Sequence, residues 1–547
     1  MSKMRKHATF LKTLAFLIPM VALVGCNGKP NGDGGNGGNG DNGSGEISIN
    51  EQSIVINNIA LLAEPFAFSK TMSQVVATAG GAETTADQML QSMIDSFAEN
   101  SFIHPVSGKT ITVTPRPLES VMTPADLLNP DSPDGMIPVG LFNRFDLAPA
   151  DGSNCGEYRI VYAKDSSGID DRMTMIFEAR VPNPNPNQGI AGCSPITDFW
   201  AARSGDSSLA DTVTELEKLY YQGITGLEPI VKAENYGLPM GQLRVNLFKT
   251  PDFNTVRWSL REFLVNFDEN GRAIFKPEPV DDSPTAALFR EAGNLPGEFD
   301  ETDLNEFRNA FLGQPLCNLV NPDRLNSSAS ATDIINGISA GFPHKYNDFE
   351  SISQGDEDNP AFNTDAQLLE AVETHLAALS DLTGVSETQL MNRAGTMTCG
   401  GCHQFSAGED LGNGATWPAS LNFVHIDEAG NLSPLLSDVF IPNRIRIAEH
   451  FRENRTPFQQ SVPPCPGAVS ESESITVSEA TASREHALFK DVDTIRNEIN
   501  EITRSPEAQA ESPEKLKTML PDLKNAVDTA RQRESAIPGA YIQDRKH

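Results

Sequence analysis

The sequence predicts an α+β protein in which a β-rich N-terminal part, residues 46–280, is followed by a mainly helical part, residues 281–463, and a tail, residues 464–547. In the first part, short alternating or β-branched segments such as GEYRIVYA and RMTMIFEARV recur between clusters of Pro, Asn, Gly and Asp. A sandwich-like packing is one form that these strands could take. In the second part, apolar residues follow the helical period. The same period after a polar linker predicts a helical hairpin in the tail.

Cap and turn residues place the individual elements. An expected helix begins beside a residue that favours helix N-termini, or follows an amphipathic pattern. Helices are expected over residues 84–99, 207–221, 302–312, 364–382, 386–395 and 442–455. Between two apolar segments of the β-rich part, Asp-Glu-Asn-Gly at 268–271 predicts a hairpin turn.

Composition and charge limit the class of protein. The chain has 547 residues, of which 39% are hydrophobic, and this excludes collagen-like and fully disordered proteins. After residue 25 no segment approaches the roughly 18 consecutive apolar residues of a membrane span. Acidic residues outnumber basic ones by 74 to 42, giving a formal net charge of −32. Because nucleic acids attract the opposite sign of charge, a nucleic-acid partner is not expected.

The N-terminus predicts export and lipid anchoring. Basic residues precede a short apolar core at 13–24, the order of a secretory signal peptide over residues 1–25. Leu23-Val24-Gly25-Cys26 resembles the lipobox of bacterial lipoproteins. The resemblance implies that acyl chains on Cys26 anchor the protein in a membrane of the cell envelope. Because Asn27 rather than Asp follows Cys26, it also implies the outer membrane. A plain signal peptide, cleaved nearby, is the alternative.

Residues 26–45 form a segment rich in Gly and Asn with almost no apolar side chains. Such a segment cannot bury enough surface to offset the conformational entropy of the chain. We therefore expect a flexible tether between the membrane anchor and a folded body.

Cys399-Gly-Gly-Cys402-His403 has the Cys-x-x-Cys-His pattern that attaches haem c covalently. Two thiols three residues apart can reach the two vinyl groups of one porphyrin, and the adjacent imidazole can then bind the iron as a fixed axial ligand. Residues 393–412 resemble the haem-binding segment of c-type cytochromes. The resemblance implies one haem c, bound through Cys399 and Cys402, with His403 as the proximal iron ligand.

Three other interpretations of the two thiols stay open. A redox-active dithiol usually opens a helix after a strand in a thioredoxin-like unit, a context that the sequence does not suggest. A structural zinc site would need two more ligands at similar spacing. The third interpretation is an ordinary disulfide between Cys399 and Cys402.

The remaining cysteines predict disulfides. With Cys26 assigned to lipid and two thiols to haem, four of the seven cysteines remain, an even number in an oxidising compartment. Three connectivities are possible. We favour Cys155–Cys193 within the β-rich part and Cys317–Cys465 in the haem-binding part.

The sixth iron ligand decides between an electron carrier and a catalyst. No Met lies between His403 and Met519, so the candidates are His425 and His450. If neither binds the iron, an open position could bind a small ligand. The helix expected over 442–455 carries four arginines that could pair with haem propionates or form a solvated face: Arg444, Arg446, Arg452 and Arg455.

A rival catalytic motif is weaker. Gly337-Ile-Ser-Ala-Gly341 matches the Gly-x-Ser-x-Gly elbow of α/β-hydrolases, with His375 as a candidate base. The elbow needs a strand before the serine and a helix after it, and Pro343 interrupts the segment that follows. A hydrolase is therefore not the preferred interpretation.

The sequence thus predicts a lipid-anchored extracytoplasmic monohaem c-type cytochrome that passes electrons to or from a redox partner protein or a small molecule. A haem-dependent redox enzyme with an open sixth position is the first alternative. A non-redox envelope lipoprotein with a Cys399–Cys402 disulfide is the second.

Overall fold

The computed structural model describes residues 48–164, 171–237, 239–249, 257–281, 283–289, 298–320, 330–339, 341–342, 344–353, 364–379 and 384–458. They all fall in one unit of the chain, Ile47–His547. The expected signal peptide, the tether and the helical hairpin of the tail lie outside the described residues.

The strands of the unit form one large antiparallel sheet of eight strands, which confirms the β-rich N-terminal part. Its order is β1 (Val55–Ile56), β4 (Met136–Arg144), β5 (Asn154–Lys164), β6 (Asp171–Pro182), β7 (Gln242–Lys249), β8 (Ser259–Phe267) and β10 (Ser351–Ile352), with β9 (Ala273–Glu278) also paired to β8. The expected turn at 268–271 joins β8 to β9, and Gly271 adopts φ +76° there. Two small hairpins complete the strands: β2 (Ser101–Ile103) with β3 (Thr110–Thr112), and β11 (Asp410–Gly412) with β12 (Ala415–Thr416).

Helices form in the six segments where they were expected. Asp300 rather than Thr302 caps the third of these helices, and the helix expected from Thr364 has no side-chain cap. The capping boxes at Thr85 and Ser386 open α3 and α11, and Ser208 caps α6. The α-helices are α1 (Ile59–Leu62), α2 (Phe68–Ala79), α3 (Ala86–Ser96), α4 (Pro124–Leu128), α5 (Ser194–Ala202), α6 (Leu209–Tyr221), α7 (Glu301–Phe311), α8 (Gln314–Val320), α9 (Ala331–Gly337), α10 (Ala366–Ala378), α11 (Glu387–Thr396) and α12 (Ile441–Asn454). In the part of the chain that the structure describes, no helix is long and apolar enough to cross a membrane.

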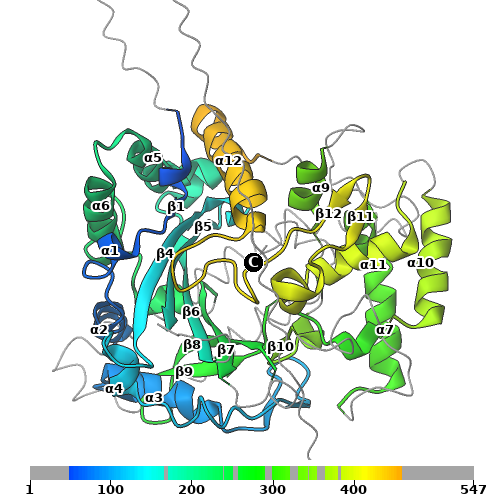
Figure 1. The fold of residues 1–547 in the computed structure, drawn as a ribbon, viewed down its shortest axis with the longest axis horizontal. Helices are drawn as coiled ribbons and strands as arrows, with labels where there is room; N and C mark the ends of the chain where they lie inside the picture. The colour runs from blue at the N-terminus through cyan, green and yellow to red at the C-terminus, as the bar shows by residue number, and fades with distance from the viewer. Residues whose placement is uncertain are drawn as a thin grey trace, which may run out of the picture. The chain divides into compact units, whose positions relative to one another are not determined.

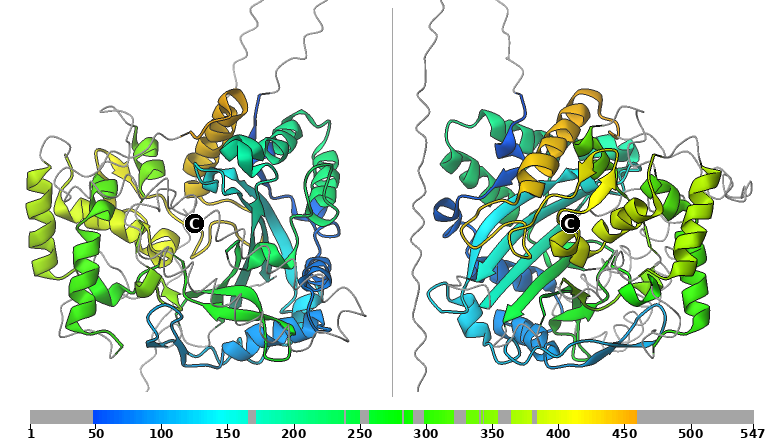
Figure 2. Two further views of the ribbon diagram at one scale, coloured as in Figure 1. Left: turned by 180° about the vertical axis from the view of Figure 1, so that it is seen from behind. Right: turned by 45° about the vertical axis from the view of Figure 1, so that its right-hand side comes forward.

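Helices cover both faces of the large sheet. Figures 1 and 2 show α1, α2, α5 and α6 on one side and α7, α10 and α11 on the other. The sandwich-like arrangement is therefore wrong for the described strands, since helices rather than a second large sheet pack on them. The short strand β10 comes from the part expected to be helical, and it joins that part to the edge of the sheet at β8.

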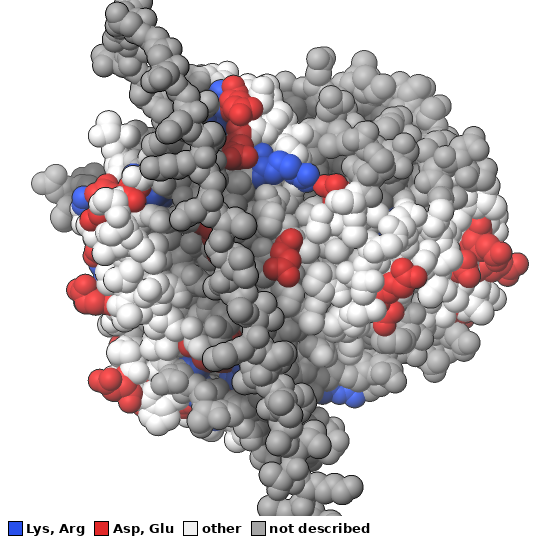
Figure 3. Space-filling model, turned by 45° about the horizontal axis from the view of Figure 1, so that its top comes forward, with Lys and Arg blue, Asp and Glu red and all other residues white. Residues whose placement is uncertain are grey.

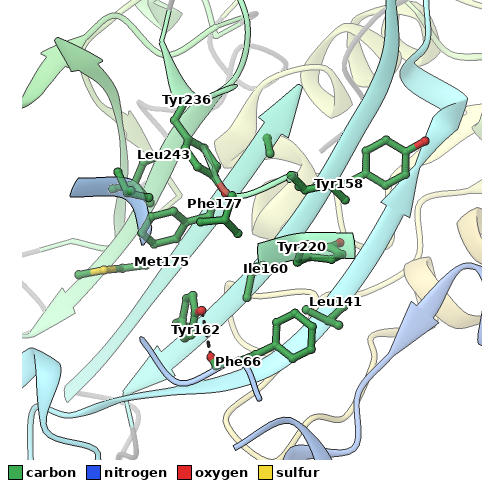
Figure 4. Packing of buried hydrophobic residues seen from close by; sticks show 14 of the residues in the cluster. Phe66, Leu141, Tyr158, Ile160, Tyr162, Met175, Phe177, Tyr220, Tyr236 and Leu243 are labelled. Carbon is green, nitrogen blue, oxygen red and sulfur yellow. Dashed lines mark hydrogen bonds between the residues drawn. The ribbon is translucent and has the colours of Figure 1, made fainter. Parts of the chain in front are cut away.

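One face of the sheet is apolar and packs against the N-terminal helices. Side chains at alternate positions point to this face, for example Ile160 and Tyr162 on β5 and Leu243 on β7, all fully buried. Figure 4 shows Tyr162 and Ile160 beside Phe66 and Tyr220 from the helical layer, with Leu243 beside Phe177 on the neighbouring strands. The Tyr162 hydroxyl donates a hydrogen bond to the carbonyl oxygen of Phe66 at 3.0 Å, which satisfies its polar atom inside the core.

The opposite face of the same strands carries charged side chains. Arg159 lies between Tyr158 and Ile160 on β5, and Arg244 lies between Leu243 and Val245 on β7, so alternation places both arginines away from the apolar core. Arg244 is nevertheless only 1% exposed, because the C-terminal part of the unit covers this face. At the surface, acidic side chains are dispersed over the described residues of the face seen in Figure 3, in line with the net charge.

Candidate functional site

The Cys-x-x-Cys-His segment lies on a helical turn that packs against the edge of the sheet. It follows α11 and continues into a π-helix, η10 (Gly401–Phe405). The amide of Gly400 donates to Ser351 Oγ at 3.0 Å, and Ser353 Oγ donates to the Gly400 carbonyl at 2.6 Å. Strand β10 and the residue after it therefore fix the motif beside β8. Short π-helical turns are frequent at functional sites.

Both glycines of the motif are required by close packing. A Cβ atom on Gly400 would lie 2.1 Å from the carbonyl oxygen of Ile352, and one on Gly401 would lie 1.7 Å from that of Gly395. Both distances are far below a van der Waals contact with backbone atoms, which cannot move aside cheaply. The two residues between the thiols are glycines because only glycine leaves room for the neighbouring backbone.

His403 is held in the way that metal-binding histidines are held. Its Nδ1 lies 2.8 Å from the carbonyl oxygen of Phe423 and must donate to it, because a carbonyl only accepts. This bond leaves Nε2 as the nitrogen with a lone pair. The ring packs against Trp258 at a centroid distance of 5.1 Å. Burial lowers the pKa of His403 to about 4, so the imidazole is neutral at pH 7, the state that binds a metal.

Strained backbone surrounds the bond to His403. Phe423 has φ +73° and the preceding Asn422 has φ +51°, both in the left-handed region. Such conformations cost about 1–3 kcal/mol each and cluster at binding and catalytic sites. Arg172 on β6 pairs with Glu428 through Nε at 2.6 Å and donates to the carbonyl of Asn422 at 2.5 Å. The sheet thus fixes the segment whose carbonyl orients His403.

The two motif cysteines are buried thiols that are not joined to each other. Cys399 packs in an apolar cluster with Phe248, Trp258, Leu260 and Val280. Burial raises the pKa of the Cys399 thiol to about 12 and raises that of Cys402 further. A redox-active dithiol needs the opposite shift toward the thiolate. Across the described ranges, no group of three or more His, Cys, Asp or Glu is placed to hold a metal ion, so nothing there favours a structural zinc site.

A cavity lies between the charged face of the sheet and the segment that carries the histidines. Its empty volume is about 610 Å³, part of it open to solvent. The lining is formed by Phe142, Arg144, Arg159, Val161, Thr174, Ile176, Glu178, Arg244, Asn246, Leu260, His403, Val424, His425, Ile426, Leu436 and Arg444. The two thiols lie one side chain behind this wall: Cys399 packs on Leu260, and Cys402 Sγ is 3.4 Å from His425 Nε2.

Two of the four cavity arginines are matched by glutamates. Arg159 pairs with Glu157 at 2.6 Å and with Glu178 at 3.0 Å. Arg244 lies 3.1 Å from Glu262 and 3.6 Å from Glu178. Burial raises the pKa of Glu262 to about 8, which the charge of Arg244 only partly offsets. Glu157 also pairs with Arg180 at 3.7 Å. Arg159 and Arg244 thus each have at least one carboxyl partner of their own.

The other two arginines share one carboxylate. Arg144 donates to Asp146 through Nε and Nη2, both at 3.0 Å. Arg444 on α12 lies 3.7 Å from Asp146 through Nε. Burial alone would raise the pKa of Asp146, but Arg144 and Arg444 more than offset it and hold the pKa below its ordinary value.

The structure separates the two candidates for the sixth ligand. His425 is buried and lines the cavity, with its ring centroid 4.8 Å from that of His403 and its Nδ1 3.0 Å from Ser433 Oγ. His450 is not among the lining residues, and its Nε2 lies 3.2 Å from the carbonyl oxygen of Pro457. Whether either binds an iron stays a prediction.

Only one of the four arginines expected near a propionate lines the cavity. Arg444 is 4% exposed, whereas Arg446 pairs with Asp333 and Arg455 with Asp198 on more exposed surfaces. Arg452 is not part of the cavity wall. The structure adds Arg144, Arg159 and Arg244, which sequence reasoning missed. Each of these arginines interrupts a mainly apolar strand segment, and that pattern was the available signal: GLFNRF, EYRIVYA and QLRVNLF.

The remaining sequence predictions concern the other cysteines and the hydrolase-like motif. The Cys155–Cys193 disulfide is confirmed. Cys317 is disulfide-bonded, but Cys465 lies outside the described residues, as does Cys26. Helix α9, not a strand, precedes Ser339, and His375 is exposed on α10, so the context of a hydrolase elbow is missing there.

Comparisons of the chain with protein-family models, with curated proteins and with solved structures found no match.

Proposed function

We propose that this protein is a lipid-anchored extracytoplasmic monohaem c-type cytochrome that acts in electron transfer. One observation carries the proposal: the Cys-x-x-Cys-His segment orients His403 through the Phe423 carbonyl, at the wall of a cavity. A histidine whose Nδ1 is bonded to a backbone carbonyl presents Nε2 in a fixed direction, as an axial ligand requires.

The chain's own residues include the groups that a covalent porphyrin needs. Cys399 and Cys402 would form thioethers with its two vinyl groups, and His403 Nε2 would bind the iron. When bound, haem iron supplies a one-electron couple between the ferrous and ferric states. The apolar side chains around His403, including Trp258, exclude water from this side of the site. A low-dielectric setting of this kind tunes the reduction potential.

The contact between His425 and Cys402 bears on whether the protein is an electron carrier or a redox enzyme. In the thiol form, Cys402 can donate its proton to His425 Nε2, and His425 Nδ1 then donates to Ser433 Oγ. A thioether sulfur has no proton to donate, so attachment would leave His425 Nε2 with a lone pair at the cavity wall. That nitrogen can bind iron, as in an electron carrier, or accept a proton from a small ligand, as in a haem-dependent redox enzyme.

The location belongs to the proposal as well. The lipobox-like sequence ending at Cys26 supports an anchor in the cell envelope, and the outer membrane is the expected side. The Gly/Asn-rich tether that follows would let the folded body reach a redox partner protein or a small electron donor or acceptor.

The test is to express the full chain with and without the cytochrome c maturation machinery. We expect a c-type pyridine haemochrome band and a mass increase of about 616 Da, one haem group, only with the machinery. The variant with Cys399→Ser and Cys402→Ser should lose both signals, and Cys155→Ser with Cys193→Ser, which removes a distant disulfide, should keep them. Absence of the band and of the added mass in the wild type would overturn the proposal.

A further inference from the structure

We infer that Arg444 and Arg144 form a binding site for a single carboxylate group, at the place where α12 meets the charged face of the sheet. Two sources share this chemistry: a propionate of the bound haem, which rests on the proposed function, and a small free carboxylate that enters the cavity.

The Arg444 guanidinium is buried with unused donors among the described residues. The side chain is buried and lines the cavity, yet Nε and Nη1 have no hydrogen-bond partner within the described residues. The nearest carboxylate oxygen, on Asp146, is 3.7 Å from Nε, which is too long for a hydrogen bond. A buried guanidinium with unused donors is costly, and an anion that accepts from them removes the cost.

The charges around Arg444 are not balanced. Arg144 and Arg444 carry two positive charges and share Asp146 alone, whereas Arg159 and Arg244 are matched by their glutamates. One positive charge is therefore left over at this end of the cavity. Burial lowers the pKa of Arg444, and the positive charge of Arg144 lowers it further, so an added anion would relieve both effects.

A carboxylate is the anion that fits this site best. The planar guanidinium matches a carboxylate in a two-point contact. Glu178 lines the same cavity and would repel a phosphate dianion more strongly than a monoanion. The cavity wall also includes apolar side chains, among them Val161, Ile426 and Leu436. The site therefore fits a carboxylate attached to an apolar body.

The experiment uses the full chain made without the maturation machinery, and butyrate as the probe. We expect butyrate to bind in calorimetry and to raise the unfolding temperature. Arg444→Met should weaken binding at least tenfold, whereas Arg446→Met should not, because Arg446 lies on the same helix but pairs with Asp333 at the surface. If Arg444→Met does not fold, Arg444→Gln replaces it. No binding of butyrate, or equal affinity in the wild type and the Arg444 variant, would overturn the inference.

The haem-loaded chain then identifies the source of the carboxylate. If a haem propionate fills the site, butyrate no longer binds to the loaded wild type, and Arg444→Met shifts the midpoint potential of the haem. If a free carboxylate is the ligand, butyrate binds to the loaded chain as well. Should no haem attach at all, the proposed function fails, while the titration of the unloaded chain still decides this site.

Discussion

His403 Nδ1 lies 2.8 Å from the carbonyl oxygen of Phe423, a residue whose backbone adopts φ +73°. The strained conformation turns this carbonyl toward the imidazole, and Arg172 on β6 fixes the preceding residue, Asn422. The large sheet, far from the motif in sequence, thereby determines which nitrogen of His403 is available to a ligand.

The first prediction concerns His403. In a strain with the maturation machinery, His403→Ala should lower the haem-loaded fraction several-fold and change the ferric spectrum, because the proximal ligand is lost. Absorption and intact-mass measurements check this result. His375→Ala, on the exposed face of α10, is the matched control and should behave as the wild type. A His403→Ala protein with the wild-type spectrum would show that another residue binds the iron.

The second prediction separates His425 from His450. If the haem is six-coordinate, the ferric protein is low-spin, and His425→Ala should convert it to a high-spin form that binds cyanide. His450→Ala should keep the low-spin signal, because His450 lies outside the cavity wall and contacts the Pro457 carbonyl. Electron paramagnetic resonance distinguishes the two spin states. A wild type that is already high-spin would favour the redox enzyme over the carrier.

The third prediction concerns Gly401. A methyl group there would overlap the Gly395 carbonyl oxygen, so Gly401→Ala should destabilise the fold by about 1–3 kcal/mol or more, the usual cost of overpacking. Gly313→Ala is the control, since its nearest atom would be 3.2 Å away, a contact that a shift of a few tenths of an ångström relieves, and its cost should be clearly lower. Urea unfolding of both variants measures the difference. Equal stability would mean that the turn at the motif relaxes freely.

Elements that depend on local hydrogen bonds could be predicted from the sequence, whereas a contact between distant segments could not. The cap at Ser386 and the helix that it opens follow from local hydrogen bonds, so α11 was predictable, as was the turn ending at Gly271. The hydrogen-bond partner of the His403 ring was not predictable. The Phe423 carbonyl accepts from this ring only because residue 423 has a left-handed backbone conformation, which no local sequence pattern specifies.

The charged face of the sheet was missed for a related reason. Arg159 and Arg244 occupy alternate positions of apolar strands, a pattern that local reasoning assigns to a solvated face. The C-terminal part of the unit covers that face and converts the arginines into buried cavity residues. That His425 rather than His450 lines the cavity also depends on long-range packing, so the sequence could not distinguish the two histidines.

The fourth prediction follows from Glu262. Its pKa rises from 4.5 to about 8 because burial disfavours the charged form. A carboxyl with a raised pKa binds more protons in the folded than in the unfolded chain between these values, so its contribution to stability is lost as pH rises from about 4.5 to 8. Glu262→Gln removes this titration while keeping a neutral side chain. The free energy of unfolding of the wild type, relative to this variant, should therefore fall between pH 5 and pH 8.5. Urea unfolding at the two pH values measures it.

Glu269→Gln, at the exposed turn between β8 and β9, serves as the control for this comparison and should follow the wild type at both pH values.

Glu262 touches Arg244 at 3.1 Å, and Arg244 lines the cavity, so ionisation of Glu262 should also change the electrostatic potential in the cavity. In the haem-loaded protein, ionisation of Glu262 adds negative charge behind Arg244 and should lower the midpoint potential as pH rises toward 8, because negative charge stabilises the ferric state. Glu262→Gln should flatten that dependence. Parallel slopes in the variant and the wild type would assign the titration to another group.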